Sequence, residues 1–221
     1  EIFERLYGLM LAGELPSGGE VNEAQLAQRF ACSRGPVREA VQRLQGLRLI
    51  ERAPFMRARV VSLSLADLID VFELREAAEG MACRLATQRL SDEGLERLQA
   101  LVEGREAEGP AGGPGPIVPG AERRIDFHVA VARASGNRQI ERLLCQELYH
   151  LIRLYRARSG ATPGRHEEAS DEHWQIVRAM RARDAALAES LMRSHINRAT
   201  RNLAAQAEAM PGEDVNERAA E

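Results

Sequence analysis

The sequence predicts a mainly α-helical protein, with an N-terminal winged helix-turn-helix followed by an all-α antiparallel helical bundle. Three helical patterns and one hairpin pattern occupy residues 1–63, whereas residues 64–209 carry helical periodicity alone. The chain has 221 residues, 44% of them apolar, which is enough for two domains with separate cores. We therefore expect one domain over 1–63, a second over 64–209, and a polar, acidic, disordered tail over 210–221.

The first domain begins with an amphipathic helix and continues with two short helices. Apolar residues recur at helical spacing from Ile2 to Met10, and the Gly- and Pro-containing stretch at 13–19 ends this helix. Asn22 and Ser33 are the predicted N-caps of the two short helices, because their side-chain oxygens can accept hydrogen bonds from the first backbone N–H groups. The two helices therefore have the spacing of a helix-turn-helix.

A small β-hairpin is predicted after the third helix. Two segments rich in Val, Ile and Leu, at 49–52 and 58–63, lie on either side of Pro54 and are expected to pair. A hairpin in this position is a candidate wing, and it carries three arginines: Arg52, Arg57 and Arg59.

The second domain is predicted to consist of helices alone. Ser64 and Ser91 are the expected N-caps of its first two helices. Residues 109–120 include five Gly and four Pro and are expected to form a loop. The expected helices cover 64–90, 91–108, 121–158 with a break at 135–137, 167–183 and 184–207.

Charge is distributed unevenly along the chain. All 30 basic residues are Arg. Residues 1–62 contain nine Arg and seven Glu, and residues 29–59 within them contain eight Arg and two Glu. The remainder, 63–221, contains 21 Arg against 26 acidic residues. A basic first domain on an acidic body is typical of a polyanion-binding module joined to a sensor of another ligand.

Cysteine spacing and hydropathy indicate a cytoplasmic protein without a membrane partner. Cys32, Cys83 and Cys145 are widely spaced and form no Cys-x-x-Cys pair, so we expect reduced thiols rather than disulfides or a thiolate metal site. Cys83 and Cys145 are interpreted as small apolar packing groups. No apolar run approaches the roughly 20 residues that span a bilayer, and we expect no signal peptide.

The helix that follows Ser33 carries basic and amide side chains along one face. Arg34, Arg38, Gln42 and Gln45 recur at spacings of four, four and three residues and therefore share that face. Arginine pairs bidentately with guanine or phosphate and glutamine with adenine, so the face suits the major groove of DNA. The backbone N–H groups at Ser33 can bind a phosphate. The plainer alternative is the solvated face of an ordinary amphipathic helix.

The same region resembles a known family of DNA-binding regulators. The runs E-A-Q-L-A at 23–27 and C-S-R-G-P-V-R-E-A at 32–40 are similar to the winged-helix motif of the GntR family. The resemblance implies that Arg34 and Arg38 contact operator DNA.

Two positions depart from the family's pattern. Ala24 stands where relatives often have a basic residue, and Met56-Arg57 stand where the wing tip usually has a glycine. Insertion of the wing into the minor groove is therefore left open, and Arg57 is expected to contact phosphate instead. The residues expected to contact DNA are Ser33, Arg34, Arg38, Gln42 and Arg57.

Three histidines in the second domain are expected to point inward. His128 and His173 are embedded in apolar stripes, and His195 lies on the last helix. A single inward histidine is usually a hydrogen-bonded core residue. Three in one helical domain favour a metal site, because neutral imidazole is the most common metal ligand. His150 and His166 are interpreted as surface or loop residues without a role.

The C-terminal two-thirds of the chain resembles the FadR-type branch of the GntR family, in its helical FCD effector domain. The resemblance implies that the three histidines hold a divalent metal, zinc or nickel, beneath a small organic-acid effector. The similar segments are R-x-x-x-E at 75–79, F-H at 127–128, S-G-N at 135–137, and E-H-x-x-I at 172–176, with His195 following His173 by 22 residues.

Arg124 departs from this pattern, because the family's fourth metal ligand is an Asp one helical turn before His128. Asp126 lies about 200° from His128 around a helix and cannot replace that ligand. A cation near a divalent ion weakens its binding by repulsion. Two alternatives remain: an effector carboxylate completes the metal shell and pairs with Arg124, or the pocket binds the effector without metal. The residues expected to bind the effector are Arg75, Arg124 and Asn137.

These patterns predict a DNA-binding transcription regulator, by resemblance a repressor, whose operator affinity is modulated by a small organic-acid effector. Its expected partners are double-stranded operator DNA, the effector, and a second copy in a homodimer on a palindromic operator. The alternatives are a pure protein-interaction module and a helical three-histidine metal-dependent hydrolase. Hydrolysis needs a general base, but Glu172 lies about 100° around the helix from His173. We therefore expect no enzymatic activity.

Overall fold

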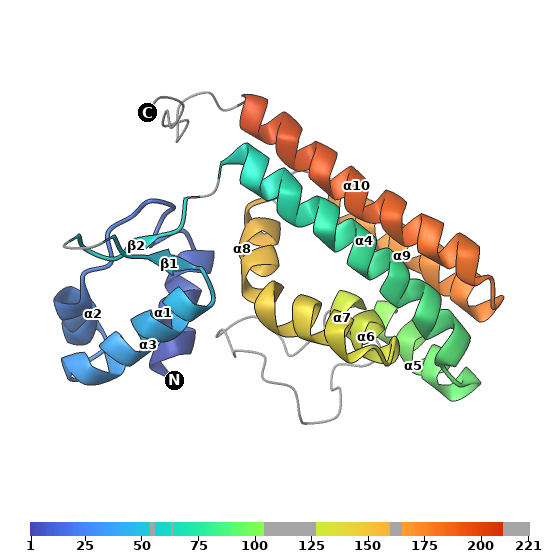
Figure 1. Cartoon of the computed structure of the whole chain (residues 1–221), viewed down its shortest axis with the longest axis horizontal. Coiled ribbons are helices and arrows are strands. Elements are labelled where there is room, and N and C mark those ends of the chain that lie inside the picture. Colours follow the sequence, from blue (N-terminus) through green and yellow to red (C-terminus); the bar gives the residue numbers. More distant parts are fainter. Residues whose placement is uncertain (54–55, 63, 104–126, 160–164, 210–221) are drawn as a thin grey trace. The chain divides into compact units, whose positions relative to one another are not determined.

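The computed structural model describes residues 1–53, 56–62, 64–103, 127–159 and 165–209, which form two compact units (Figure 1). Unit 1 contains Glu1–Ser62 and His150–Ala157. Unit 2 contains the other described residues. Most described residues are helical and one small hairpin is present, which confirms the predicted fold class.

Unit 1 contains a helix-turn-helix followed by a two-stranded hairpin. The strands pair antiparallel, with Ile50 opposite Val60 and Glu51 opposite Arg59. Glu20 adds an isolated bridge to Arg59. The elements are α1 (Ile2–Leu11), α2 (Glu23–Arg29), α3 (Arg34–Gly46), β1 (Ile50–Glu51) and β2 (Arg59–Val60).

Aliphatic side chains hold the elements of unit 1 together. Leu6 and Met10 of α1, Val41 and Leu44 of α3, and Val60 of β2 are almost completely buried. Burying a side chain of this size stabilises a fold by about 1.5–3 kcal/mol. These contacts determine which face of α3 is turned inward and which face remains exposed.

Local residues explain the turn between α2 and α3. The side chain of Asn22 accepts hydrogen bonds from the backbone N–H groups of Ala24 and Gln25, as predicted for an N-cap. Ala31 has a φ of +52°, the left-handed conformation that turns the chain between the two helices. Ser33 is the N-cap of α3 by position, but its side chain makes no capping hydrogen bond.

His150 lies in the interior of unit 1, so the expectation that it is a surface or loop residue is wrong. It is 8% exposed, and its ring packs edge-on against Phe3 and Tyr7, with centroid distances of 5.5 and 4.9 Å. Burial, together with Arg153 and Arg43, lowers the pKa of His150 to about 4. Because Tyr7 lies 143 residues away in the sequence, no local pattern predicts this contact.

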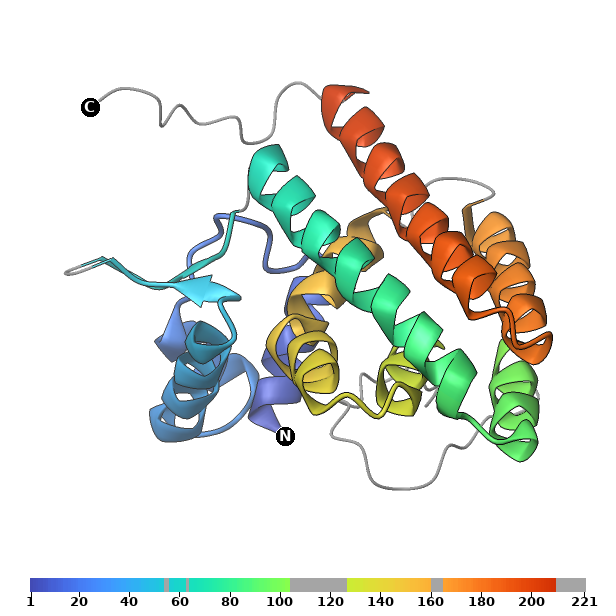
Figure 2. The same cartoon turned by 45° about the vertical axis from the view of Figure 1, so that its right-hand side comes forward.

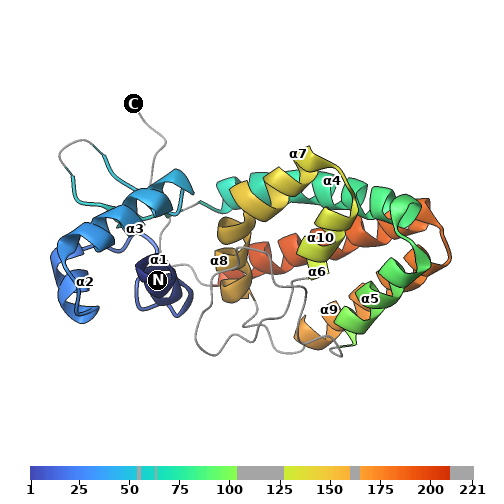
Figure 3. The ribbon, with the colours of Figure 1, turned by 90° about the horizontal axis from the view of Figure 1, so that it is seen from below.

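Unit 2 consists of helices in the residues described. The long helices α4 and α10 lie side by side and antiparallel, and α5 packs against α9 (Figures 2 and 3). The helices are α4 (Leu65–Arg89), α5 (Asp92–Val102), α6 (Phe127–Ala134), α7 (Arg138–Arg142), the π-helix η1 (Leu143–Glu147), α9 (Arg165–Arg181) and α10 (Ala185–Ala209). Helix α8 (Tyr149–Ser159) contributes His150–Ala157 to unit 1.

The start of α4 is held by a capping box. The Ser64 side chain accepts from the backbone N–H of Asp67, and the Asp67 carboxylate accepts from the backbone N–H of Ser64. Further along α4, Gly80 permits close approach of α10, because a Cβ there would lie 2.7 Å from Cγ of Arg193. Cys83 is buried and free, as expected for a packing residue, and burial raises the pKa of its thiol to about 12.

The region between α6 and α8 agrees with the prediction in part. The predicted break at 135–137 separates α6 from α7. The π-helix η1 was not predicted, since a widened turn has no distinct apolar period. The predicted loop at 109–120, Arg124, Asp126 and the tail at 210–221 lie outside the described residues. No described helix is long and apolar enough to cross a membrane.

We predict that Ser64→Ala lowers the free energy of unfolding by about 1 kcal/mol, because α4 loses its capping box. Ser33→Ala is the matched control: Ser33 occupies the same cap position on α3 without a side-chain capping bond, so its loss of stability is expected to be smaller. Urea unfolding followed by circular dichroism measures both. Equal losses in the two variants would contradict the prediction.

Candidate functional site

The exposed face of α3 carries the side chains predicted to contact DNA. Ser33, Arg34, Arg38 and Gln42 are all exposed, and Gln45 is partly exposed. The opposite face of α3 is buried through Val37, Ala40, Val41 and Leu44. The structure therefore places the predicted group on one outward surface of a helix that the unit 1 core holds in place.

Two arginines of the hairpin region are paired, one with a carboxylate and one with a backbone carbonyl. Arg57 is exposed and forms an ion pair with Glu20, and their hydrogen bond raises the pKa of Arg57. Arg59 donates to the carbonyl of Gly18 at 2.8 Å. Residues 54 and 55, which precede Met56-Arg57 in the predicted wing, lie outside the described residues.

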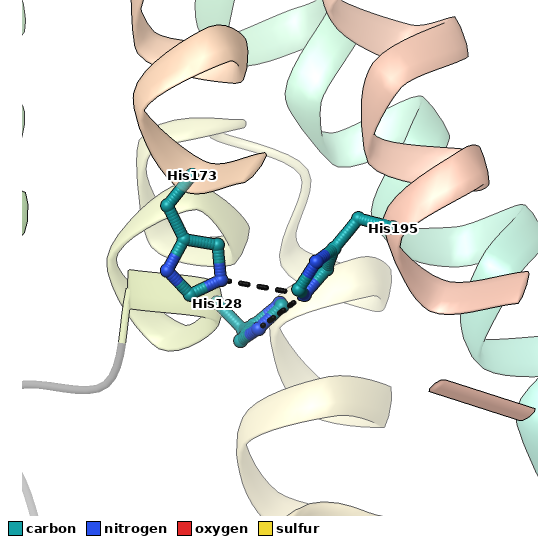
Figure 4. Close-up of side chains that lie close together, drawn as sticks. All are labelled: His128, His173 and His195. Atoms are coloured by element: carbon teal, nitrogen blue, oxygen red, sulfur yellow. Dashed lines mark hydrogen bonds between the residues drawn. The ribbon is translucent and has the colours of Figure 1, made fainter. Parts of the chain in front are cut away.

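In unit 2, three histidines from three helices meet at one point (Figure 4). His128 lies on α6, His173 on α9 and His195 on α10. Nε2 of His195 is 3.3 Å from Nε2 of His173 and 3.4 Å from Nε2 of His128. His128 and His195 are buried, as expected, and His173 is partly exposed. The ring of Phe127 stacks on His173 at a centroid distance of 4.3 Å.

A buried carboxylate orients His128. Glu79 on α4 accepts a hydrogen bond from Nδ1–H of His128 through one oxygen. Its other oxygen accepts from Nε of Arg75 at 2.5 Å. Because a carboxylate can only accept, it holds the proton on Nδ1 and leaves the Nε2 lone pair of His128 facing the other imidazoles.

A second buried carboxylate orients His195. Glu172 on α9 accepts from Nδ1–H of His195 and also pairs with Arg198 of α10. Glu172 is buried, while the Arg198 side chain is 50% exposed. Both arrangements place a carboxylate between a guanidinium and an imidazole, but the arginine is buried in the first and half in solvent in the second.

The charges of this cluster shift two pKa values. Burial alone would raise the pKa of Glu79, but Arg75 and His128 outweigh it and lower that pKa to about 2. Burial lowers the pKa of His195 to about 4, against the opposing hydrogen bond to Glu172. At neutral pH, Glu79 is therefore ionised and His195 is neutral, the form of imidazole that binds metals.

The predicted effector-binding residues are not gathered at one place in the part of the chain described. Arg75 is 2% exposed, and its guanidinium is paired with Glu79. Asn137 caps α7, accepting from the backbone N–H groups of Gln139 and Ile140. Arg124 lies outside the described residues.

The sequence patterns do not identify Glu79 and Glu172 as hydrogen-bond partners of the imidazoles. Glu79 was noted only as part of a motif, and Glu172 only as a potential base beside His173. The four-residue spacing of Arg75 and Glu79 is a signal for an ion pair on one helix face. No comparable signal links Glu172 to His195, since they lie on different helices.

The three imidazoles fit a divalent metal. Their ligand atoms lie within 4.8 Å of one another, and the two Nε2 separations at His195 are 3.3 and 3.4 Å. Zinc–nitrogen bonds of about 2.0–2.1 Å at tetrahedral angles place neighbouring nitrogens about 3.3–3.4 Å apart. Three such donors leave one tetrahedral position for another ligand.

A helix-turn-helix with a wing, in a chain whose helical second unit gathers three histidines, defines a DNA-binding regulator with a separate helical domain. Residues 1–60 match the bacterial regulatory proteins of the gntR family, and residues 70–198 match the FCD domain. The chain therefore belongs to the GntR family, in its FadR-type branch with a C-terminal FCD domain. It is a transcription regulator and not an enzyme, which removes the hydrolase alternative.

Two relatives are named as repressors. The chain is 29% identical to the probable D-xylose utilization operon transcriptional repressor of Paenarthrobacter nicotinovorans, over 83% of this chain and 79% of that protein. It is 27% identical to the HTH-type transcriptional repressor GlaR of Escherichia coli strain K12, over 85% of this chain and 87% of that protein.

The solved structure of E. coli McbR/YncC has a similar fold. It matches with a TM-score of 0.68 at 20% identity, over 93% of this chain and 96% of that one. At this level of identity the match concerns the fold alone.

We predict that Glu79→Gln lowers the free energy of unfolding of the metal-free protein by on the order of 3 kcal/mol, because buried Arg75 loses its counter-charge. Glu172→Gln is the matched control: it removes the same charge, but half-exposed Arg198 can be hydrated, so a loss of about 1 kcal/mol or less is expected. Urea unfolding at pH 7 with a chelator present compares the two. If Glu172→Gln lost as much stability as Glu79→Gln, burial of the arginine would not determine the cost of removing its carboxylate partner.

Proposed function

We propose that this chain is a transcriptional repressor whose operator affinity is controlled by a small organic acid bound beside a divalent metal in unit 2. In this proposal residues 1–63 bind the operator and residues 64–209 bind the effector. The observation that carries it is the convergence of three imidazoles, two of them oriented by buried carboxylates, in a chain that also has a GntR-type helix-turn-helix.

The exposed face of α3 supports the DNA-binding role. Arg34, Arg38 and Gln42 present exposed guanidinium and amide groups, which can hydrogen-bond base edges and phosphates. Ser33 at the start of α3 leaves its hydroxyl and the first N–H groups for a phosphate, since its side chain makes no cap bond. The names of the two relatives support repression as the outcome.

The carboxylates support a metal-binding role for the histidines. Glu79 and Glu172 accept from the Nδ1–H groups of His128 and His195, which leaves the Nε2 atoms of these two histidines as potential metal donors. His128, His173 and His195 would hold the ion. When bound, the metal would supply a Lewis acid for an effector carboxylate. The Nε2 atom of His195 lies 3.3 and 3.4 Å from those of His173 and His128, a spacing that suits tetrahedral zinc.

We further propose that the chain acts as a homodimer. Two copies related by a twofold axis would place two α3 helices on successive major grooves of a palindromic operator. Effector binding would change operator affinity only to the extent that it favours one arrangement of the DNA-binding units over another.

We predict that Arg38→Ala lowers the preference for the operator by about tenfold or more while the protein remains folded, because Arg38 lies on the exposed face of α3 and one well-placed arginine contributes about 1–3 kcal/mol of discrimination. Operator duplexes can be selected from random sequences with the wild-type protein, and binding measured by mobility shift. Arg97→Ala, which removes an exposed arginine from α5, is the control and should bind normally. Unchanged discrimination by Arg38→Ala would remove α3 as the reading helix.

We predict that His173→Ala reduces zinc affinity by more than about 100-fold, because loss of a ligand should exceed the 10–100-fold effect of losing a ligand's hydrogen-bond partner. His150→Gln, at a histidine outside the cluster, should retain affinity. Zinc competition with a chromophoric chelator measures both. If His173→Ala binds zinc as the wild type does, the histidines are not its ligands and the metal-free mode of effector binding is favoured.

A further inference from the structure

The carboxylate of Glu23 in unit 1 lies close both to α3, the helix proposed to read the operator, and to the residue that follows strand β1. Glu23 is the first residue of α2, and its side chain is only 12% exposed. One of its oxygens lies 2.6 Å from a terminal nitrogen of Arg52, which directly follows β1. The other lies 3.6 Å from Nε of Arg38, in the middle of α3. Glu23 thus connects two arginines from different elements.

The two arginines are much more exposed than the carboxylate. The Arg38 side chain is 60% exposed and that of Arg52 40% exposed. Ion pairs that involve exposed side chains contribute little to stability, because water solvates the charges and ordering the side chains costs entropy. The arrangement is therefore better explained by the orientation of the guanidiniums than by the stability of unit 1.

A carboxylate at this place has an electrostatic cost for DNA binding. It brings a negative charge next to two arginines on the surface proposed to meet the phosphates, and so weakens attraction that does not depend on sequence. It also restricts where Arg38 can place its donors. A bidentate contact to guanine depends on the orientation of the guanidinium and carries sequence information, whereas a contact to phosphate carries none.

We infer that Glu23 is a positioning residue for sequence discrimination: its carboxylate draws Arg38 and Arg52 toward one point between α3 and the wing, so that the two guanidiniums meet the operator together. The inference rests on the proposed operator binding and goes beyond it by naming what sets selectivity. Glu23 contributes by restraining Arg38 and by lowering affinity for DNA of other sequence.

Glu20 provides a matched comparison within the same unit. It also pairs with an arginine, Arg57, but both side chains are more exposed, at 37% and 72%, and α3 is not part of the pair. Glu23→Gln and Glu20→Gln therefore remove the same charge from the same unit. Only Glu23→Gln releases an arginine of α3.

The test compares wild type, Glu23→Gln and Glu20→Gln by fluorescence anisotropy with two duplexes, at several salt concentrations. One duplex is an operator selected by the wild-type protein, and the other is a scrambled duplex of the same composition. Both variants should bind the scrambled duplex more tightly at low salt. Only Glu23→Gln should lose discrimination between the duplexes, by about tenfold or more, the contribution of one well-placed arginine.

A second experiment, made in the Arg38→Ala variant, separates a positioning role of Glu23 from a general effect on the structure of unit 1. If Glu23 acts mainly through Arg38, then adding Glu23→Gln to Arg38→Ala should leave the remaining discrimination unchanged. The inference is overturned if Glu23→Gln retains wild-type discrimination, or if Glu20→Gln loses as much. If the wild-type protein prefers no duplex at all, it is the proposed operator binding that fails instead.

Discussion

The buried chain of Arg75, Glu79 and His128 is the constraint on which the histidine cluster depends. A guanidinium and a carboxylate that are almost fully withdrawn from water are tolerable only when they neutralise each other and have their hydrogen bonds satisfied. Arg75 and Glu79 meet this condition as neighbours on α4, and Glu79 then has one oxygen left for Nδ1 of His128. The orientation of that imidazole therefore follows from the need to neutralise a buried arginine.

A glutamate paired with arginine occurs in both units, with different degrees of burial. Glu79 is buried with its arginine, Glu172 is buried with a half-exposed arginine, and Glu23 is nearly buried between two exposed ones. As burial of the arginine decreases, the cost of removing its carboxylate partner falls. All basic residues of the chain are arginines. A carboxylate can accept hydrogen bonds from separate donors through each of its two oxygens, and it thereby orients each side chain that it contacts.

Much of the fold was predictable because its signals are local. The caps at Asn22, Ser64 and Ser91, the apolar stripe of α3 and the antiparallel hairpin follow from spacing and residue type over a few positions. Prediction was incomplete or wrong where the partner is distant. The surface interpretation of His150 was wrong, because Phe3 and Tyr7 enclose it. The π-helix η1 was not anticipated, because a widened turn leaves the pattern of apolar residues nearly unchanged.

The sequence by itself determined that three histidines lie on separate helices of one domain, two of them within apolar stripes, and that arginines and glutamines line one face of another helix. Both conclusions follow from helical periodicity, which relates residues three or four positions apart. Only the tertiary structure decided that the three Nε2 atoms meet, that Glu172 reaches His195, and that Glu23 lies between Arg38 and Arg52. Those contacts join different helices, and their geometry depends on how whole elements pack rather than on the spacing within any one of them.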